Sequence, residues 1–242
     1  MNDLLNKASQ NTTTYTGLPM KKRLIAVGDI HGHYYPLIRL LDIIHPTPQD
    51  KFVFIGDYID RGPHSKQVIE YLIDFEKKYD AVFLRGNHED MLLAYICEDP
   101  EAQYGDSYPI NGSDKTAYSY TGRENSLPEL KQYLPISHLN FIKRTLLYYE
   151  MDKYIFVHAG VYPNVPMKLQ KRENLLWIRE PFFRYPTGLN KIVVFGHTVM
   201  KDVIISKSRI AIDTGAGCNL SLSAIELNSK KKYSINIEDK LD

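Results

Sequence analysis

The stretch GDYIDRG, residues 56–62, follows directly on the apolar run Phe52–Ile55. A short apolar run that a glycine closes predicts a buried β-strand ending at that glycine. Asp57, Asp60 and Arg61 therefore stand just past a strand end, which is where α/β folds place their chemistry. The same order of apolar strand and polar loop recurs on both sides of this stretch.

Two further units in the first half have this order. The apolar run 24–27 ends in GDIHG at residues 28–32, and the run 81–84 ends in RGNHE at residues 85–89. An amphipathic helix is expected after each loop, including one over 65–79 after GDYIDRG. Three consecutive strand–helix units predict parallel strands with right-handed crossovers.

Strands dominate the prediction for the second half. After a helix that begins at the N-cap Ser137 and runs through Leu146, apolar runs alternate with tight turns. The expected strands lie at 146–150, 153–157, 192–195, 203–206, 209–213, 222–227 and 232–237, and the last four form two hairpins. We therefore expect an α/β protein in which two mixed β-sheets pack face to face as a sandwich flanked by helices.

Two stretches lack a periodic apolar pattern. Residues 1–20 are polar and rich in Asn and Thr, which predicts a flexible N-terminal tail before a single domain over 21–242. Residues 98–135 are rich in Gly, Pro, Ser, Asn and Tyr, and long irregular stretches are often lids or binding loops. We interpret 98–135 as a lid-like insertion over a site, with a plain surface excursion as the alternative. Its tyrosines are expected to stack on a substrate ring or to pack the insertion against the body.

The composition is that of an ordinary globular protein. Of the 242 residues, 43% are hydrophobic and 24% charged, and the formal net charge is +1. This balance gives no field to attract nucleic acid or an anionic membrane, so neither is an expected partner. The sequence has neither an apolar run of the roughly 18 residues that span a membrane nor a signal peptide pattern, and a cytoplasmic location is expected. Cys97 and Cys218 are expected to be reduced, buried and inert.

Residues of the types that bind metals follow five of the predicted strands. They are Asp29, His31, Asp57, Asp60, Asn87, His88, His158 and His197. If the strand ends meet at one edge, this cluster suits a pair of divalent metals, because Asp supplies hard oxygen, His supplies borderline nitrogen and one carboxylate can bridge two ions. Two such ions can activate a water for in-line attack at phosphorus, so the cluster predicts phosphate ester hydrolysis. The remaining histidines lack this context and are left out of the metal shell.

The motifs GDIHG, GDYIDRG, RGNHE, HAG and GHT resemble, in order and approximate spacing, those of the phosphoprotein phosphatase family of calcineurin-like metallophosphoesterases. This family includes the eukaryotic serine/threonine phosphatases and smaller bacterial and phage relatives. The resemblance extends from about Leu24 to Leu227. LLWIRE at residues 175–180 and HAG at 158–160 resemble the bacterial and phage branch in particular.

The resemblance implies a centre of two divalent metals. Manganese is the expected metal, with iron and zinc as alternatives. One metal would bind Asp29, His31 and Asp57, and the other would bind Asp57, Asn87, His158 and His197. Asp57 would bridge the two, and a hydroxide shared by both metals would attack the phosphorus.

The resemblance also implies roles for residues outside the metal shell. His88 would protonate the leaving oxygen, and Asp60 would orient His88 by accepting its other N–H. Arg61 and Arg179 would bind the phosphate oxygens, because a guanidinium donates two parallel hydrogen bonds. Arg85 and Asp213 are expected to have structural or supporting roles.

Three functions remain open at this point. The leading one is a protein serine/threonine phosphatase with a phosphoprotein or phosphopeptide substrate, and with some activity on phosphotyrosine as an option. The second is a diadenosine tetraphosphate or nucleoside polyphosphate hydrolase, although this chain has GNHE at residues 86–89 where that branch usually has GNHD. The third is an inactive phosphoprotein-binding module, which the complete ligand set argues against. IDTGAGCNLSLSAIEL, residues 212–227, does not match the SAPNYC loop of eukaryotic members, so no regulatory subunit is inferred.

Overall fold

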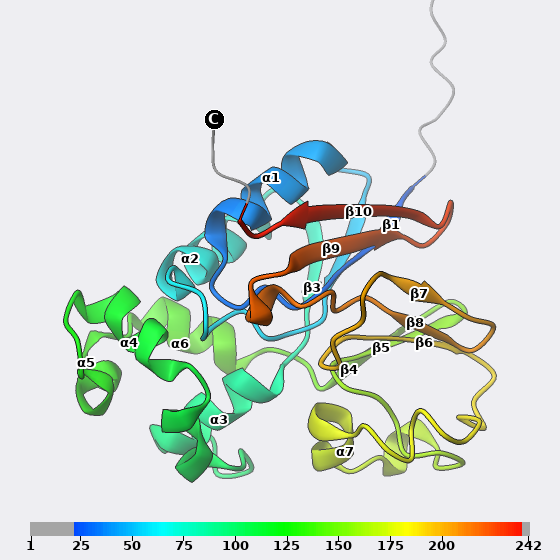
Figure 1. Cartoon of the computed structure of the whole chain (residues 1–242). Helices are drawn as coiled ribbons and strands as arrows, with labels where there is room; N and C mark the ends of the chain where they lie inside the picture. Colours follow the sequence, from blue (N-terminus) through cyan, green and yellow to red (C-terminus); the bar gives the residue numbers. More distant parts are fainter. Residues whose placement is uncertain (1–21, 239–242) are drawn as a thin grey trace, which may run out of the picture.

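The computed structural model describes residues 22–238, and its first β-sheet contains the three parallel strands expected from the first half (Figure 1). The strand order is β10-β9-β1-β2-β3. β1 pairs in parallel with β2, and β2 with β3, while β9 lies antiparallel to both β1 and β10. The strands are β1 (Leu24–Val27), β2 (Lys51–Phe54), β3 (Asp80–Phe83), β9 (Ser221–Glu226) and β10 (Lys231–Asn236).

The second sheet is also mixed. Its order is β4-β5-β6-β8-β7, with β5, β6 and β8 parallel and the outer strands β4 and β7 antiparallel to their neighbours. Its strands are β4 (Tyr148–Met151), β5 (Tyr154–Val157), β6 (Ile192–Phe195), β7 (Ile204–Ile205) and β8 (Arg209–Ala211). The two expected hairpins, β7–β8 and β9–β10, are confirmed, and β4 and β5, expected as strands on either side of a tight turn, also pair antiparallel.

Side chains of the two sheets meet in a buried layer between them. Alternate residues of a strand point to opposite faces, so Leu24 and Ala26 of β1 lie in this layer together with Phe156 and Val194 of the other sheet. Ile25, on the opposite face of β1, belongs to a separate core under the helices. Strands buried on both faces read as continuous apolar runs, which explains why the sequence located them.

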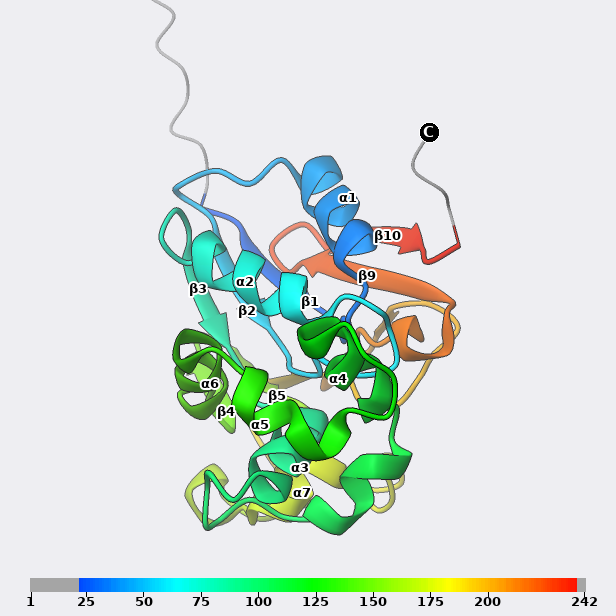
Figure 2. The same cartoon turned by 90° about the vertical axis from the view of Figure 1, so that its left-hand side faces the viewer.

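Helices cover the outer faces of both sheets. α1 (Tyr34–Ile44) and α2 (Ser65–Phe75) pack on the first sheet, where Leu40 and Leu72 are fully buried. On the second sheet, Leu175 of α7 (Arg172–Trp177) and the following Phe182 pack in a core with Phe195. The expected sandwich of two mixed sheets between helical layers is therefore confirmed (Figure 2).

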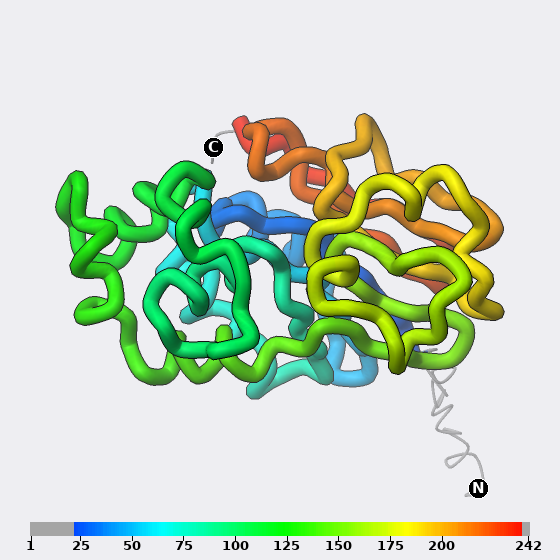
Figure 3. The backbone as a smooth tube through the Cα atoms, turned by 90° about the horizontal axis from the view of Figure 1, so that it is seen from below, coloured from blue at the N-terminus to red at the C-terminus, as the bar shows by residue number. Residues whose placement is uncertain are grey.

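The segment 98–135 is more regular than expected. Its short helices pack beside α3 (Asn87–Tyr95) and α2 (Figures 2 and 3). Tyr108 in this segment is fully buried. They are the 3₁₀ helices η1 (Gly105–Ile110) and η2 (Leu127–Glu129) and the α-helices α4 (Ser113–Thr121) and α5 (Leu130–Tyr133). The expectation of an irregular stretch was wrong, because the buried stripe of α4 consists of polar, small and aromatic side chains.

Some boundaries also differ from the prediction. α2 ends at Phe75, four residues before the expected end. α6 (Ile136–Lys143) is capped by Pro135 instead of Ser137, and it stops before Leu146, which forms an isolated bridge to Leu84. Two short 3₁₀ helices, η3 (Met167–Leu169) and η4 (Ala216–Cys218), lie in loops. The predicted tail over 1–20 falls outside the described residues, and within 22–238 no helix has the length and apolar character needed to cross a bilayer.

Candidate metal and phosphate site

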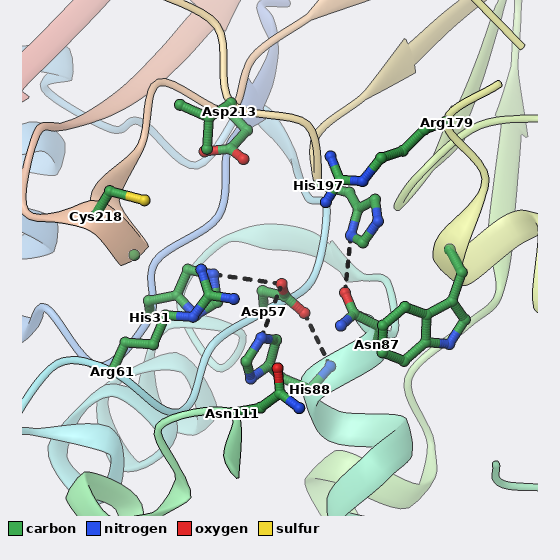
Figure 4. A pocket seen from close by; sticks show the side chains of 13 residues that line it. His31, Asp57, Arg61, Asn87, His88, Asn111, Arg179, His197, Asp213 and Cys218 are labelled. Carbon is green, nitrogen blue, oxygen red and sulfur yellow. Dashed lines mark hydrogen bonds and ion pairs between the residues drawn. The ribbon is translucent and has the colours of Figure 1, made fainter. Parts of the chain in front are cut away.

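The carboxyl ends of β1, β2, β3, β5 and β6 meet, and the polar residues that follow them gather around one pocket of about 290 Å³ (Figure 4). Seven of the predicted site residues line this pocket, namely His31, Asp57, Arg61, Asn87, His88, Arg179 and His197. Figure 4 shows the imidazoles, Asp57 and Asn87 turned toward one another, with Arg61 and Arg179 on either side.

Asp57 stands at the centre of this arrangement. Its Oδ2 lies 3.4 Å from His31 Nε2, and its Oδ1 lies 3.5 Å from His158 Nε2. Both imidazoles place Nδ1 against a backbone carbonyl, His31 at 3.1 Å from Ile59 O and His158 at 2.9 Å from Ile55 O. A proton on each Nδ1 satisfies those carbonyls and leaves each Nε2 lone pair directed at Asp57, which is the orientation a metal ligand needs.

The side-chain oxygen of Asn87 lies between the two histidines that follow strands of the second sheet, His158 and His197. Asn87 Oδ1 lies 2.8 Å from His158 Nε2 and 2.9 Å from His197 Nδ1. Donor atoms of Asp57, His158 and His197 lie within 4.8 Å of one another, and those of His31, Asp57 and His88 form a second such group. Asp57 belongs to both groups, as a carboxylate that bridges two metals would, but the second group includes His88, the predicted proton donor, and does not include the predicted ligand Asp29.

Asp29 lies next to these ligand groups, and its hydrogen bonds and pKa indicate whether a metal ion fits there. Its Oδ2 accepts the backbone N–H of His197 at 3.0 Å, while its buried Oδ1 has no hydrogen-bond partner within residues 22–238. Burial and the neighbouring carboxylates of Asp213 and Asp57 raise the pKa of Asp29 well above its usual range. A divalent cation would relieve both the unpaired oxygen and the excess negative charge, so the residues fit a metal centre.

The electrostatic field of the pocket keeps Asp57 ionised. Burial alone would raise the pKa of Asp57, but at the low pH where its carboxyl would take up a proton the surrounding imidazoles are charged, with His158 the largest contributor, and they hold this pKa below its usual range. Burial lowers the pKa of His31 well below normal and lowers the pKa of His197 to about 3. A charged carboxylate among neutral imidazoles is the protonation state that metal binding requires.

His88 is held by Asp60 behind the pocket. Its Nδ1 lies 2.7 Å from Asp60 Oδ2, while its Nε2 lies 4.0 Å from Asp57 Oδ2. Burial tends to lower the pKa of His88, but the carboxylates of Asp57 and Asp60 outweigh it and raise the pKa. A histidine whose charged form is stabilised and which lines the pocket can act as a proton donor.

Arg61 and Arg179 bring positive charge to the pocket. The backbone N–H of Arg61 donates to Gly112 O at 3.0 Å, and Arg179 Nη1 donates to Thr198 Oγ1 at 2.9 Å. A Cβ placed on Gly217 would come within 2.8 Å of Arg61 Nη1 and 2.5 Å of His31 Cδ2. The pocket therefore needs glycine at 217, because any side chain there would collide with the two predicted site residues.

Several residues of the site were not predicted from the sequence. Glu89 accepts the backbone N–H groups of Asp57 at 2.9 Å, Tyr58 at 2.7 Å and Gly86 at 3.0 Å, and so ties the loops after β2 and β3 together. Burial and the charge of Asp57 raise the pKa of Glu89 to about 8. The position of Glu89 directly after Asn87 and His88 was the available signal.

Other pocket residues were not predicted either, and they lie far apart along the chain. Asn111, Trp177, Val199 and Cys218 all line the pocket. Cys97 and Cys218 are free, as expected, but both are exposed, so the expectation that they are buried was wrong.

Arg85 and Asp213 occupy different places, because Asp213 lines the pocket and Arg85 does not. Arg85 is buried and donates to Asp99 Oδ2 at 2.6 Å and Lys143 O at 2.7 Å, which makes its contacts structural. Asp213 lines the pocket and accepts the backbone N–H of Gly215 at 2.9 Å. Burial, with the charge of Asp57, raises the pKa of Asp213 to about 6.

A comparison with protein families agrees with this geometry. The family model described as calcineurin-like phosphoesterase matches residues 22–222, which is most of the chain. The chain belongs to the calcineurin-like phosphoesterase family. Members of this metallophosphoesterase family are metal-dependent phosphoester hydrolases with a binuclear divalent-metal centre, and the donor groups around Asp57 supply candidate ligands for it.

Solved structures share this fold at low sequence identity. A candidate diadenosine tetraphosphatase is 21% identical with a TM-score of 0.70, and the match covers 90% of this chain and 95% of that one. A protein serine/threonine phosphatase from Saccharomyces cerevisiae is 15% identical with a TM-score of 0.59, over 91% and 82% of the two chains. A cold-active protein-tyrosine phosphatase from a Shewanella species is 16% identical with a TM-score of 0.57, over 89% and 80%. At these identities the likeness concerns the fold alone.

Proposed function

We propose that this calcineurin-like phosphoesterase is a phosphomonoesterase that acts on phosphoserine and phosphothreonine of a phosphoprotein or phosphopeptide. The observation that carries the proposal is the buried pair of His88 and Asp60, with Nδ1 and Oδ2 only 2.7 Å apart. Asp60 holds His88 with Nε2 on the pocket side, 4.0 Å from Asp57 Oδ2. A general acid in this place supports cleavage of esters whose leaving oxygen needs a proton.

The chemistry of the leaving group distinguishes the candidate substrates. Serine and threonine leave as alkoxides, which are strong bases and depart slowly unless they are protonated. In a dinucleoside polyphosphate the leaving group is a nucleotide phosphate, a weak base that gains little from an acid. The His88–Asp60 pair therefore favours an alcohol ester as the substrate.

The other site residues would bind the metals and the phosphate group. Asp29, His31, Asp57, Asn87, His158 and His197 would hold two divalent cations, with manganese as the expected metal. When bound, such cations lower the pKa of water and stabilise negative charge on phosphate oxygens. Arg61 and Arg179 would bind the non-bridging phosphate oxygens from two sides of the pocket, because guanidinium groups match phosphate geometry.

A diadenosine tetraphosphate hydrolase is the second candidate. It is supported by the TM-score of 0.70 with a candidate enzyme of that type. Trp177 in the pocket wall and the exposed Tyr104, whose ring lies 5.1 Å from that of Trp177, would supply faces on which an adenine could stack. The same two rings could instead contact the residues that flank a phosphorylated side chain.

Initial rates on a matched set of substrates test the proposal. The protein is stripped of metal with a chelator and restored with manganese, and hydrolysis is then followed for a phosphothreonine peptide, a phosphotyrosine peptide, an aryl phosphate and diadenosine tetraphosphate. We expect metal-dependent phosphate release from the phosphothreonine peptide at a higher kcat/KM than for the dinucleotide. A preference for the dinucleotide would select the second candidate, and absence of turnover on all four would reject both.

A further inference from the structure

Side chains of segment 98–135 contact Asp60, the partner of the proposed general acid His88. We propose that Tyr108 and Thr116 of this segment are positioning residues for catalysis, because they fix the carboxylate of Asp60 that orients His88. The inference rests on the proposed function, since it concerns the residue that would protonate the leaving group. Segment 98–135 would then contribute to the reaction itself by positioning Asp60, and would not serve as a cover over the pocket.

Every oxygen of the Asp60 side chain has a specific partner. Oδ2 faces His88 Nδ1 at 2.7 Å. Oδ1 accepts from the Tyr108 hydroxyl at 3.1 Å and from Thr116 Oγ1 at 2.5 Å. Asp60 is completely buried, so no water replaces a partner that is lost. The plane of the carboxylate, and with it the direction of the bond to His88, is thus set by two hydroxyls from η1 and α4.

The direction of each proton follows from what the groups can donate. An ionised carboxylate only accepts, so both Tyr108 and Thr116 must donate to Asp60. Thr116 has one proton, so it accepts from Ser65 Oγ, which lies 2.9 Å away. The backbone N–H of Asp60 donates to Thr116 Oγ1 at 2.9 Å and to Ser65 Oγ at 3.1 Å. Thr116 therefore holds both the main chain and the side chain of Asp60.

Tyr108, which supports Asp60, is itself packed in the core. Tyr108 is fully buried, and its ring packs 5.5 Å from that of Tyr95 on α3, the helix that begins with Asn87 and His88. Burial and the charge of Asp60 raise the pKa of Tyr108 well above its usual value, so its hydroxyl keeps the proton that it donates. Asp60 has a φ of 69°, an unfavourable value that the contacts to its N–H help to maintain.

A loss of either donor should therefore affect proton transfer more than binding. The freed Asp60 carboxylate could rotate, and the imidazole of His88 would lose its alignment with the leaving oxygen. Small errors in the position of a catalytic group can cost about 100-fold in rate. An ester with a poor leaving group depends on this proton, while an ester with a good leaving group depends on it little.

The test compares Tyr108→Phe with Tyr120→Phe, a matched control from the same segment. Tyr120 is also buried, and its hydroxyl bonds to His138 Nδ1 at 2.9 Å, away from Asp60. Rates are measured with manganese on an alkyl phosphate and on aryl phosphates of increasing leaving-group acidity. We expect Tyr108→Phe to lose about 10- to 100-fold in kcat on the alkyl ester and less than about 3-fold on the most acidic aryl ester. Tyr120→Phe is expected to leave the ratio of the two rates unchanged.

A second pair keeps the inference testable if Tyr108→Phe does not fold. Thr116→Val removes the hydroxyl at similar volume, and Thr116→Ser retains it. We expect Thr116→Val to show the same selective loss and Thr116→Ser to restore most of the activity on the alkyl ester. Metal content and melting temperature are measured for each variant, so that lost metal or lost folding is recognised.

Two results would overturn the inference. One is a loss of equal size on all esters in Tyr108→Phe and Thr116→Val, which would indicate a purely structural role. The other is full activity on the alkyl ester in both variants. Failure of the proposed function is distinguishable, because in that case the wild-type protein itself would not hydrolyse the esters.

Discussion

Five residues at the pocket have backbone angles that non-glycine residues seldom adopt. The φ angles are 47° for His31, 53° for Asp57, 69° for Asp60, 70° for Arg61 and 61° for His197. Such conformations cost on the order of 1–3 kcal/mol each and persist only where neighbouring contacts hold them. Here Glu89, Thr116 and Asp29 accept the N–H groups of Asp57, Asp60 and His197 respectively. The site is therefore held in its geometry by the surrounding fold.

At the same scale, His88→Asn tests the general acid. We expect this variant to keep its metals, because His88 is assigned outside the metal shell, and to lose about 100-fold or more in turnover of a phosphothreonine peptide. The loss should be smallest for an aryl phosphate with a good leaving group. Metal analysis and kcat on both substrates check the prediction. Equal losses on the two would show that His88 does not protonate the leaving oxygen.

Asp213 gives the metal-free protein a pH-dependent instability. Its folded pKa of about 6 exceeds the ordinary value of 3.8, so the folded state binds the proton more tightly and loses free energy of unfolding as pH rises through this window. In Asp213→Asn the free energy of unfolding should no longer fall in this pH window. Without metal, we expect the variant to exceed wild type by at most about 3 kcal/mol above about pH 6 and to match it near about pH 4.

Denaturant unfolding of both proteins at several pH values measures this difference. Divalent metal should shrink it, because the cations offset the negative charge near Asp213. An advantage of the same size at every pH would contradict the electrostatic explanation.

At the scale of elements, an ion-pair cluster joins α3 to α7. Arg172 at the start of α7 pairs with the fully buried Asp90 of α3, Nε to Oδ1 at 3.0 Å, and with Asp99, Nη2 to Oδ2 at 3.0 Å. Arg85 reaches the same two carboxylates. α7 in turn carries Trp177, whose ring lies 5.9 Å from that of His197. The cluster therefore fixes one wall of the pocket.

Arg172→Met tests this connection between the helices. Removal of one partner leaves buried carboxylate charge only partly compensated by Arg85, and we expect a loss of about 2–4 kcal/mol in the free energy of unfolding. Arg123→Met is the control, because Arg123 forms an exposed pair with Glu129, and its effect should be much smaller. Denaturant titration compares the two. Equal stability of the two variants would contradict a structural role for the cluster.

The elements also show what the sequence could and could not predict. The strands were predictable because both of their faces are buried, which leaves unbroken apolar runs such as Leu24–Val27. The helix α4 was missed although Ser113, Thr116, Ala117 and Tyr120 form a buried stripe at helical spacing. Such a stripe lacks the aliphatic periodicity that identifies a helix in a sequence, and its member Thr116 is the one that contacts Asp60.

The site residues also differ in whether they could be predicted from the sequence. Those that follow a strand, such as Asp57 and His158, were predictable because parallel strands place their carboxyl ends together. Asn111, Trp177 and Cys218 reach the pocket from the ends of the short elements η1, α7 and η4, whose positions depend on tertiary packing. Local pattern carries no information on that packing, so these residues could not be assigned from the sequence.

On the scale of the whole molecule, both sheets are needed to build the site. Asp57 and Asn87 follow strands of the first sheet, while His158 and His197 follow strands of the second. The buried layer between the sheets sets the distance between these pairs. Asp57 contacts residues from both sheets, so it is the residue on which the proposed metal centre most depends.

Metal stoichiometry and activity of Asp57→Asn therefore give the strongest test of the proposed two-metal centre. Manganese bound per chain and phosphate release from a phosphothreonine peptide are measured side by side for wild type, Asp57→Asn and the surface control Asp74→Asn. We predict two bound ions and turnover in wild type and control, and in Asp57→Asn fewer than two ions and a rate lower by orders of magnitude. Full metal content and full activity in Asp57→Asn would contradict the account.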